Sequence, residues 1–256
     1  MKISIVINAD TRPKRNSADQ MLSGVVSEDF LTDGVFNKIK FFDGFDRETI
    51  VFIDEHLPVP EKTLEYLRSI CDTVIIRKHT NEHGFNDLNY MTALFSARGD
   101  VIAHFDQDVA AFTPNQDYPN YLLELLNEWK YVSYPSPFSP NAVTDPAYNY
   151  RWASTRFFMC KRETIDFTEC LRCLREYEYF TGKYNPSRVH PWTEHILGLT
   201  ANSSVYYPRI ELDRGTIFTW GSYEEWTLRR LNELSYDSVK DFVSKRGIGY
   251  PCDLNC

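Results

Sequence analysis

The sequence contains no long hydrophobic run. None of its apolar stretches approaches the roughly 20 residues that a helix needs to cross a bilayer. The apolar run within residues 1–8 is too short for the core of a signal peptide, and no small-residue cleavage site follows it. We therefore expect no membrane span and a soluble, unexported protein that resides in the cytoplasm.

Positive charge is also scarce. Lys and Arg number 28 against 36 Asp and Glu, which gives a formal net charge of −8. Proteins that bind a nucleic-acid backbone need a basic face, because their affinity comes from neutralising phosphates and releasing counterions. Nucleic acid is therefore not an expected partner. An anionic small ligand would need local Arg and Lys or a bound cation to offset the repulsion.

The cysteines are not arranged as zinc ligands. There are 6 of them, and the pairs Cys170/Cys173 and Cys252/Cys256 resemble zinc half-sites only loosely. We interpret them as scattered cytosolic thiols.

The sequence does have the composition and patterning of a globular α/β domain. Hydrophobic residues make up 43% and charged residues 25% of its 256 positions. Short apolar runs predict strands, and patterns with helical spacing lie between them. The predicted strands are 2–8, 50–54, 73–77 and 101–105, and the clearest helices are 60–71 and 86–98. This alternation predicts an α/β fold with a mostly parallel sheet flanked by helices, with ligands bound beyond the carboxyl ends of the strands.

The second half of the chain is less regular. A proline-rich loop at 135–146 precedes a predicted strand at 156–161 and a predicted helix at 163–179. The tail carries helical patterns at 223–234 and 239–246.

Two carboxylates follow the fourth predicted strand. Asp106 and Asp108 are separated by Gln107, and residues i and i+2 of an extended chain point to the same side. The two side chains can therefore converge on one cation. Oxygen ligands suit Mn²⁺ or Mg²⁺, which complete their shells with phosphates and water. The same pattern also fits a solvated turn or a helix N-cap, but its position at the end of a strand favours the metal site.

Several segments match one known family in order along the chain. They are 5–10, 52–54, 84–89, 97–100, 106–108, 155–162 and 192–195. Over residues 2–200 they resemble the GT-A glycosyltransferases, closest to the family-2 group of inverting enzymes. The resemblance implies a GT-A domain at 1–205, built on a nucleotide-binding, Rossmann-like sheet. It would have a nucleotide-sugar-binding half (1–110) and an acceptor half (111–205), followed by a helical C-terminal extension at 206–256.

The resemblance also implies roles for the donor-binding residues. Ala9, Asp10 and Asp54 match the positions that hold the nucleoside in that family. Asp106 would contact ribose or metal, and Asp108 would bind the metal.

Other matching positions depart from the family pattern. Asn89 lies in the helix before the D-x-D motif, but Leu88 stands where the family often has a basic residue. A third metal ligand often comes from the C-terminal segment. Asp213 is the candidate here, and His190 is its rival.

The catalytic base is expected in the segment Trp192-Thr193-Glu194-His195. His195 stands where the family has its aspartate, and Glu194 precedes it. Adjacent helix positions point about 100° apart, so only one of the two faces the acceptor. We favour Glu194, because a carboxylate is ionised at neutral pH. A helix start capped by Thr193 explains the same residues, and the histidine leaves a retaining mechanism open.

The predicted function is metal-dependent transfer of a sugar from a nucleotide-diphosphate-sugar donor, with a UDP-sugar favoured, to a carbohydrate or other hydroxyl acceptor, with inversion. A nucleotidyltransferase is the nearest alternative, although residues 10–15 lack the glycines of its phosphate loop. A non-catalytic binding domain is the other. Nothing in the sequence excludes a homo-oligomer.

Overall fold

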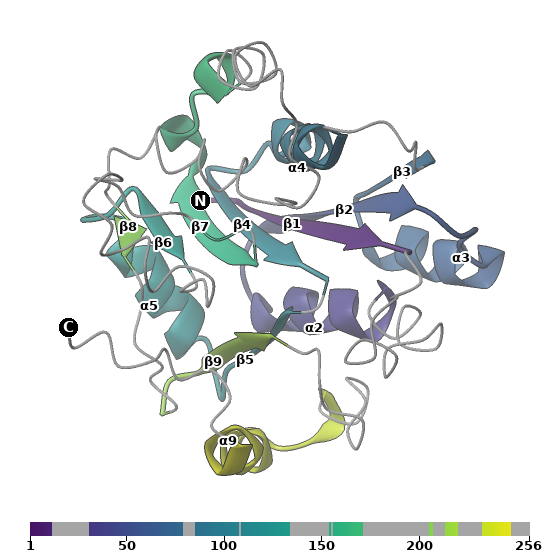
Figure 1. Cartoon of the computed structure of the whole chain (residues 1–256). Helices are drawn as coiled ribbons and strands as arrows, with labels where there is room; N and C mark the ends of the chain where they lie inside the picture. The colour runs from purple at the N-terminus through teal and green to yellow at the C-terminus, as the bar shows by residue number, and fades with distance from the viewer. Residues whose placement is uncertain are drawn as a thin grey trace.

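A computed structural model of the chain describes residues 1–11, 31–78, 85–107, 109–133, 154, 156–170, 205–206, 213–219 and 232–246. At residues 10, 85–90, 205–206, 218–219 and 246 it describes the backbone alone. Within this part of the chain the strands form a seven-stranded sheet and a two-stranded ribbon (Figure 1).

The seven-stranded sheet is parallel on one side and mixed on the other. Its strands, in spatial order, are β3 (Thr73–Lys78), β2 (Arg47–Glu55), β1 (Ile3–Asp10), β4 (Val101–Asp106), β7 (Phe157–Lys161), β6 (Tyr131–Ser133) and β8 (Val205–Tyr206). The first four run parallel, β7 runs antiparallel to both neighbours, and β8 is parallel to β6. The predicted α/β fold with a mostly parallel sheet is confirmed, as are all four predicted parallel strands.

Helices cover both faces of this sheet. They are α2 (Asp33–Phe41), α3 (Glu61–Ile70), α4 (Phe85–Ser96) and α5 (Asp117–Leu125). A further helix, α9 (Tyr236–Arg246), lies below the two-stranded ribbon in Figure 1. In Figure 1, α2, α3 and α5 lie below the sheet and α4 lies above it. Two separate groups of buried side chains fill the two layers. Val35, Leu67 and Leu122 belong to the group below, and Met91 and Leu94 to the group above.

The central strands are apolar on both faces because both faces are covered. Ile5 and Ile7 of β1 point toward α2, while Val6 points toward α4. In β2, Val51 and Ile53 alternate in the same way with Phe52. Such near-continuous runs are typical of buried parallel strands, and they explain why the sequence predicted these strands so directly.

The helix expected at 163–179 begins later than predicted. Arg162–Thr164 forms a 3₁₀ turn, Ile165 is extended and buried beside α4, and the α-helix starts at residue 167. Asp166 ends the extended stretch, and its carboxylate accepts the Glu169 amide N–H at 2.9 Å. The prediction was wrong by one turn, because the cap is Asp166.

Glu48 ties the amino ends of the parallel strands together. Its Oε1 accepts the Ser4 hydroxyl at 2.5 Å and the backbone N–H groups of Arg98 and Gly99 at 2.6 and 3.0 Å. Its Oε2 lies 3.4 Å from Nζ of Lys2. One nearly buried carboxylate therefore joins β1, β2 and the turn that enters β4.

Gly99 is needed in this turn because there is no room for a side chain. A Cβ at Gly99 would lie 2.7 Å from the Lys2 carbonyl oxygen and from the Ser4 amide nitrogen. We expect Gly99→Ala to lower the free energy of unfolding by about 2–3 kcal/mol, measured by urea denaturation. Gly44→Asn is the control, since Gly44 has φ +83° with open space around it, a conformation that asparagine tolerates. Equal urea midpoints for the two variants would contradict the steric explanation.

The C-terminal region packs against the first half of the chain. Strand β9 (Thr216–Thr219) pairs antiparallel with β5 (Val109–Phe112), directly after the D-x-D motif. Asn232 exchanges side-chain hydrogen bonds with α2, donating to the Asp33 carbonyl and accepting from Asn37. The division into 1–205 and 206–256 stays a prediction. Among the helices described, none is long and apolar enough to cross a membrane.

Candidate nucleotide and metal site at the carboxyl edge of the sheet

Three predicted site residues end neighbouring parallel strands. In the register of the sheet, Asp10 pairs with Asp54 and Asn8 pairs with Asp106. All four residues therefore lie at the carboxyl edge, where this architecture binds ligands. The backbone of Ala9 lies there too, but its side chain is buried in the apolar layer beneath the sheet.

The D-x-D turn is held by backbone hydrogen bonds to both neighbouring strands. The Asp106 N–H donates to the Arg156 carbonyl at 2.9 Å, and the Gln107 N–H donates to the Asn8 carbonyl at 2.9 Å. Nζ of Lys38, from α2, donates to the Gln107 carbonyl at 3.2 Å. Asp106 is partly exposed at the end of β4, so its carboxylate can reach a ligand. Asp108 lies outside the described residues.

A buried polar pair lies directly behind Asp106. The side-chain nitrogen of Asn8 is 2.7 Å from Nε2 of His104, which is fully buried. The His104 ring stacks on Phe158, with centroids 4.9 Å apart and an interplanar angle of 11°. The Asn8–His104 pair packs on the α4 side of the sheet and supports the D-x-D turn from that side. Sequence reasoning assigned no role to Asn8 or His104, although both stand in strands that lead into the motif.

The loops after β1 and β2 are joined by Thr11. Its hydroxyl accepts the N–H groups of His56 and Leu57 and donates to the Leu57 carbonyl, each at 2.8 Å. Its own N–H donates to the Asp54 carbonyl at 3.1 Å. At the proposed nucleoside-binding edge, the loops after β1 and β2 are therefore held together by hydrogen bonds.

Asp54 has a histidine neighbour that the sequence analysis did not identify. Nε2 of His56 lies 3.3 Å from Oδ2 of Asp54, whose exposed fraction is 6%. A nucleoside base would have to approach a carboxylate that already contacts an imidazole. In the sequence, this contact was indicated only by the position of His56, two residues after Asp54.

The structure does not bring Asp213 to the D-x-D turn. Thr219 of β9 pairs with Val109 beside the motif, while Thr216 pairs with Phe112 at the other end of the ribbon. Asp213 lies beyond that far end, more than about 10 Å along the ribbon at 3.3 Å per residue. Its exposed carboxylate accepts a hydrogen bond from Lys240, which lowers the pKa of Asp213.

For the remaining predicted site residues, the structure describes the backbone of one and none of the others. Asn89 lies in α4, whose backbone alone is described at that position. Glu194, His195 and His190 lie outside the described residues, so the expected catalytic base stays a prediction.

A hard divalent cation fits the donor chemistry of this edge. Asp106 offers carboxylate oxygen at a partly exposed strand end, and oxygen donors are what Mn²⁺ and Mg²⁺ prefer. Within the described part of the chain, no three His, Cys, Asp or Glu side chains gather into a complete metal site. The remaining ligands of such an ion would come from Asp108, substrate phosphates and water.

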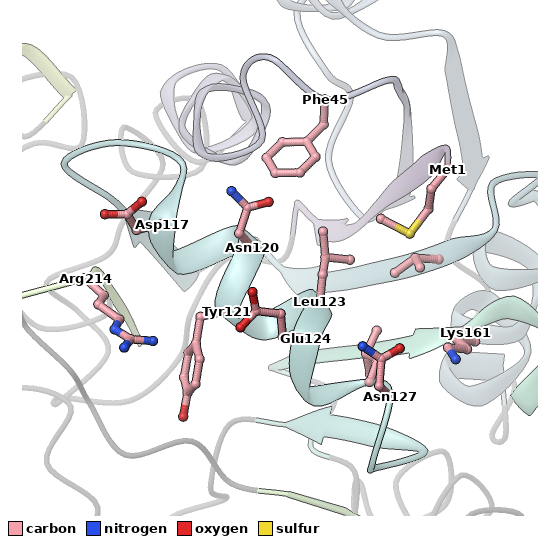
Figure 2. Close-up of a pocket in the computed structure, with 12 residues that line it drawn as sticks. Met1, Phe45, Asp117, Asn120, Tyr121, Leu123, Glu124, Asn127, Lys161 and Arg214 are labelled. Carbon is pink, nitrogen blue, oxygen red and sulfur yellow. The ribbon is translucent and has the colours of Figure 1, made fainter.

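A groove of about 710 Å³ lies at the opposite edge of the sheet (Figure 2). Met1, Val101 at the start of β4 and Lys161 at the end of the antiparallel β7 contribute to its lining. The polar face of α5 forms much of its wall, including Tyr121, on whose ring Arg214 lies at 4.8 Å. Because it lies at the amino ends of the parallel strands, this groove is separate from the carboxyl edge that carries Asp106.

No protein-family model and no curated protein matches the sequence. Solved structures do match the fold. The apo form of the glycosyltransferase GlyE of Streptococcus pneumoniae matches with a TM-score of 0.52 at 11% identity, over 98% of this chain and 65% of that chain. The present chain thus spans less than two thirds of the length of that enzyme.

Nucleotidyltransferase structures match with similar scores. A cytidylyltransferase from Leptospira borgpetersenii has a TM-score of 0.51 at 14% identity, over 96% of this chain and 95% of that chain. A putative glucose-1-phosphate thymidylyltransferase from Bacillus anthracis gives 0.50 at 13%, over 93% and 96%. The chain therefore has the Rossmann-like α/β fold found in both glycosyltransferases and nucleotidyltransferases.

Proposed function

We propose that this chain is a metal-dependent glycosyltransferase that moves a sugar from a nucleotide-diphosphate-sugar, with a UDP-sugar favoured, to a hydroxyl acceptor. The observation that carries the proposal is the position of Asp106. It ends the central strand β4, in register with Asn8 of β1, at the ligand-binding edge of a nucleotide-binding fold. The likeness to solved glycosyltransferase structures supports the fold that this chemistry needs.

We assign different parts of donor binding to different residues at this edge. Asp10 and Asp54, paired at the ends of β1 and β2, would hold the nucleoside. Asp106 and Asp108 would bind Mn²⁺ or Mg²⁺, which when bound would neutralise the charge of the leaving diphosphate. Such a cation would offset the repulsion between a diphosphate and a protein with a net charge of −8.

On the acceptor side, the proposal needs a general base. In an inverting transfer, Glu194 or His195 would remove the proton of the acceptor hydroxyl as it attacks the sugar carbon. A retaining transfer would not need that base. The stereochemistry of the product, read by NMR of the anomeric proton, distinguishes the two mechanisms.

A thermal-shift panel tests the donor. We expect one of the UDP-, GDP- and dTDP-sugars to raise the melting temperature with Mn²⁺ and not with EDTA. At 100 times the Kd, linkage stabilises the folded state by about 2.7 kcal/mol, and that raises Tm by about 5–10 °C for a chain of this size. Equal shifts with and without Mn²⁺, or none with any donor, would count against the proposal.

A nucleotidyltransferase is the second candidate. It is favoured by the solved cytidylyltransferase, which this chain matches over almost its whole length. The absence of glycine from residues 10–15 counts against it, since those enzymes bind phosphates with a glycine-rich loop after the first strand. Incubation with a nucleoside triphosphate and a sugar phosphate decides between the two: released pyrophosphate identifies a nucleotidyltransferase.

A further inference from the structure

Lys38 is completely buried on α2, although its side chain ends in an ammonium group. Its exposed fraction is 0%. Nζ donates to the Gly34 carbonyl, one turn earlier in the helix, at 3.1 Å and to the Gln107 carbonyl at 3.2 Å. It also lies 5.9 Å from the centroid of the Phe105 ring. The contact with Gln107 joins α2 to the middle residue of the D-x-D motif.

This contact completes the anchoring of Gln107. The N–H of Gln107 is held by the Asn8 carbonyl of β1, and its C=O is held by Lys38. Both peptide groups that flank the residue are therefore fixed. The two bonds hold the turn that follows Asp106 against both β1 and α2.

The neighbouring residue of α2 holds the segment that follows. Oδ1 of Asn37, which is almost fully buried, accepts the Ala111 N–H of β5 at 2.8 Å. Helix α2 thus contacts the chain just before and just after Asp108, through two adjacent side chains that point in different directions. The result is a rigid support beneath the proposed metal-binding turn.

An ammonium group is a costly way to fill space between a helix and a sheet. Burial removes its hydration, and an apolar side chain of similar length would fill the same volume at lower cost. A charged donor does offer a stronger hydrogen bond to a carbonyl than a neutral donor can. The Lys38 ammonium donates such bonds to Gly34 within α2 and to Gln107 of the D-x-D turn, and the bond to Gln107 is the one that reaches the proposed site.

We propose that Lys38 is a positioning residue that holds the Gln107 carbonyl and so fixes the D-x-D turn that presents Asp106 to the metal-nucleotide complex. The inference rests on the proposed function for its ligand. The hydrogen bond itself can be tested without any ligand.

The test compares Lys38→Met with the wild-type chain in three measurements. Methionine keeps the length and apolar stem of lysine without the donor, so we expect Lys38→Met to fold with an unchanged or higher Tm. Hydrogen exchange in the peptide spanning 101–112 should become at least about fivefold faster, because one charge-assisted bond to the turn is lost. The Kd for Mn²⁺ in the presence of UDP should rise by at least about fivefold for the same reason.

Two variants of the same helix serve as controls. Lys40→Met removes an equal charge from an exposed lysine that donates to the Asn232 carbonyl at 3.0 Å, away from the turn. Val35→Ala removes methyl groups from a fully buried position and destabilises α2 without removing a bond to the turn. Both should leave the Mn²⁺ Kd within about twofold at a temperature where they are fully folded. If Lys38 were merely structural, Lys38→Met would behave like Val35→Ala: it would lower Tm and leave the Mn²⁺ Kd unchanged.

The outcomes separate this inference from the proposed function. Wild-type exchange rates in Lys38→Met, or unchanged or tighter Mn²⁺ binding, overturn the positioning role while leaving the proposed function intact. Tighter binding would mean that the ammonium acts only by repelling the cation. If the wild-type chain binds no Mn²⁺ with UDP, the proposed function fails, and hydrogen exchange alone decides whether Lys38 holds the turn.

Discussion

Replacing Asp106 or Asp108 by alanine is expected to abolish Mn²⁺-dependent binding of UDP and of the donor sugar. Each substitution would remove a proposed oxygen ligand of the cation, whose charge would offset the repulsion between this acidic protein and a diphosphate. Loss of residues that merely orient a metal ligand costs 10–100-fold in affinity, so loss of a ligand should cost about 100-fold or more. Isothermal calorimetry with UDP and Mn²⁺ measures the effect.

A matched control is Asp117→Ala, which removes an exposed carboxylate from the first turn of α5 at the opposite edge of the sheet. The Kd of Asp117→Ala for UDP in the presence of Mn²⁺ should equal that of the wild-type chain. Asp213→Ala tests the third-ligand prediction in the same experiment: unchanged binding would mean that Asp213 serves only its ion pair with Lys240. Binding that survives both Asp106→Ala and Asp108→Ala would contradict the metal site and favour a scaffold without catalysis.

Replacing Glu48 by alanine is expected to cost about 3–4 kcal/mol of unfolding free energy. The substitution leaves the buried Ser4 hydroxyl and the Gly99 N–H without their shared carboxylate acceptor, and it leaves Lys2 without its ion pair. Urea denaturation at pH 7 measures the loss. A cost below about 1 kcal/mol, typical of surface pairs, would show that solvent replaces the carboxylate.

The same carboxylate gives stability a pH dependence. Burial alone raises the pKa of Glu48, but the bonds from Ser4 and from the Arg98 N–H, the charge of Lys2 and the Gly99 N–H outweigh it and lower the pKa below its ordinary value. A lowered folded-state pKa means that the stabilisation is fully present above the unfolded-state pKa, about 4.3, and is lost as the pH falls through the folded-state value. Wild-type and Glu48→Gln unfolding energies should therefore converge as the pH falls below about 4. A gap that stays constant down to pH 2 would contradict the linkage.

The parallel half of the fold could be predicted because its signals are local. Strands β1, β2 and β4 are buried on both faces and read as continuous apolar runs, the half-buried edge strand β3 contains a shorter apolar run, and α3 and α4 have clear helical spacing. Helix α2 gave no such signal, since two of its buried residues, Asn37 and Lys38, are polar. Ribbon β5–β9 was also missed, because four-residue strands become recognisable only through pairing with a distant segment.

The candidate site likewise combines residues with a local sequence signal and residues that depend on contacts between distant segments. The sequence identified Asp54 and Asp106 because each ends an apolar strand, and both lie at the expected edge. It could not identify Lys38, which is 69 positions from Gln107 and whose burial depends on the packing of α2 under β4. Thr11 and His56 form their contacts through loop conformation, which composition does not reveal.

The pairing of β5 with β9 also determines when the site can be completed during synthesis. Strand β5 follows the D-x-D motif at once, but its partner ends only at Thr219. Until that residue has left the ribosome, the nascent chain carries β5 with an open hydrogen-bonding edge. A product truncated before residue 216 would therefore lack β9 and the pairing that holds the segment after the D-x-D motif.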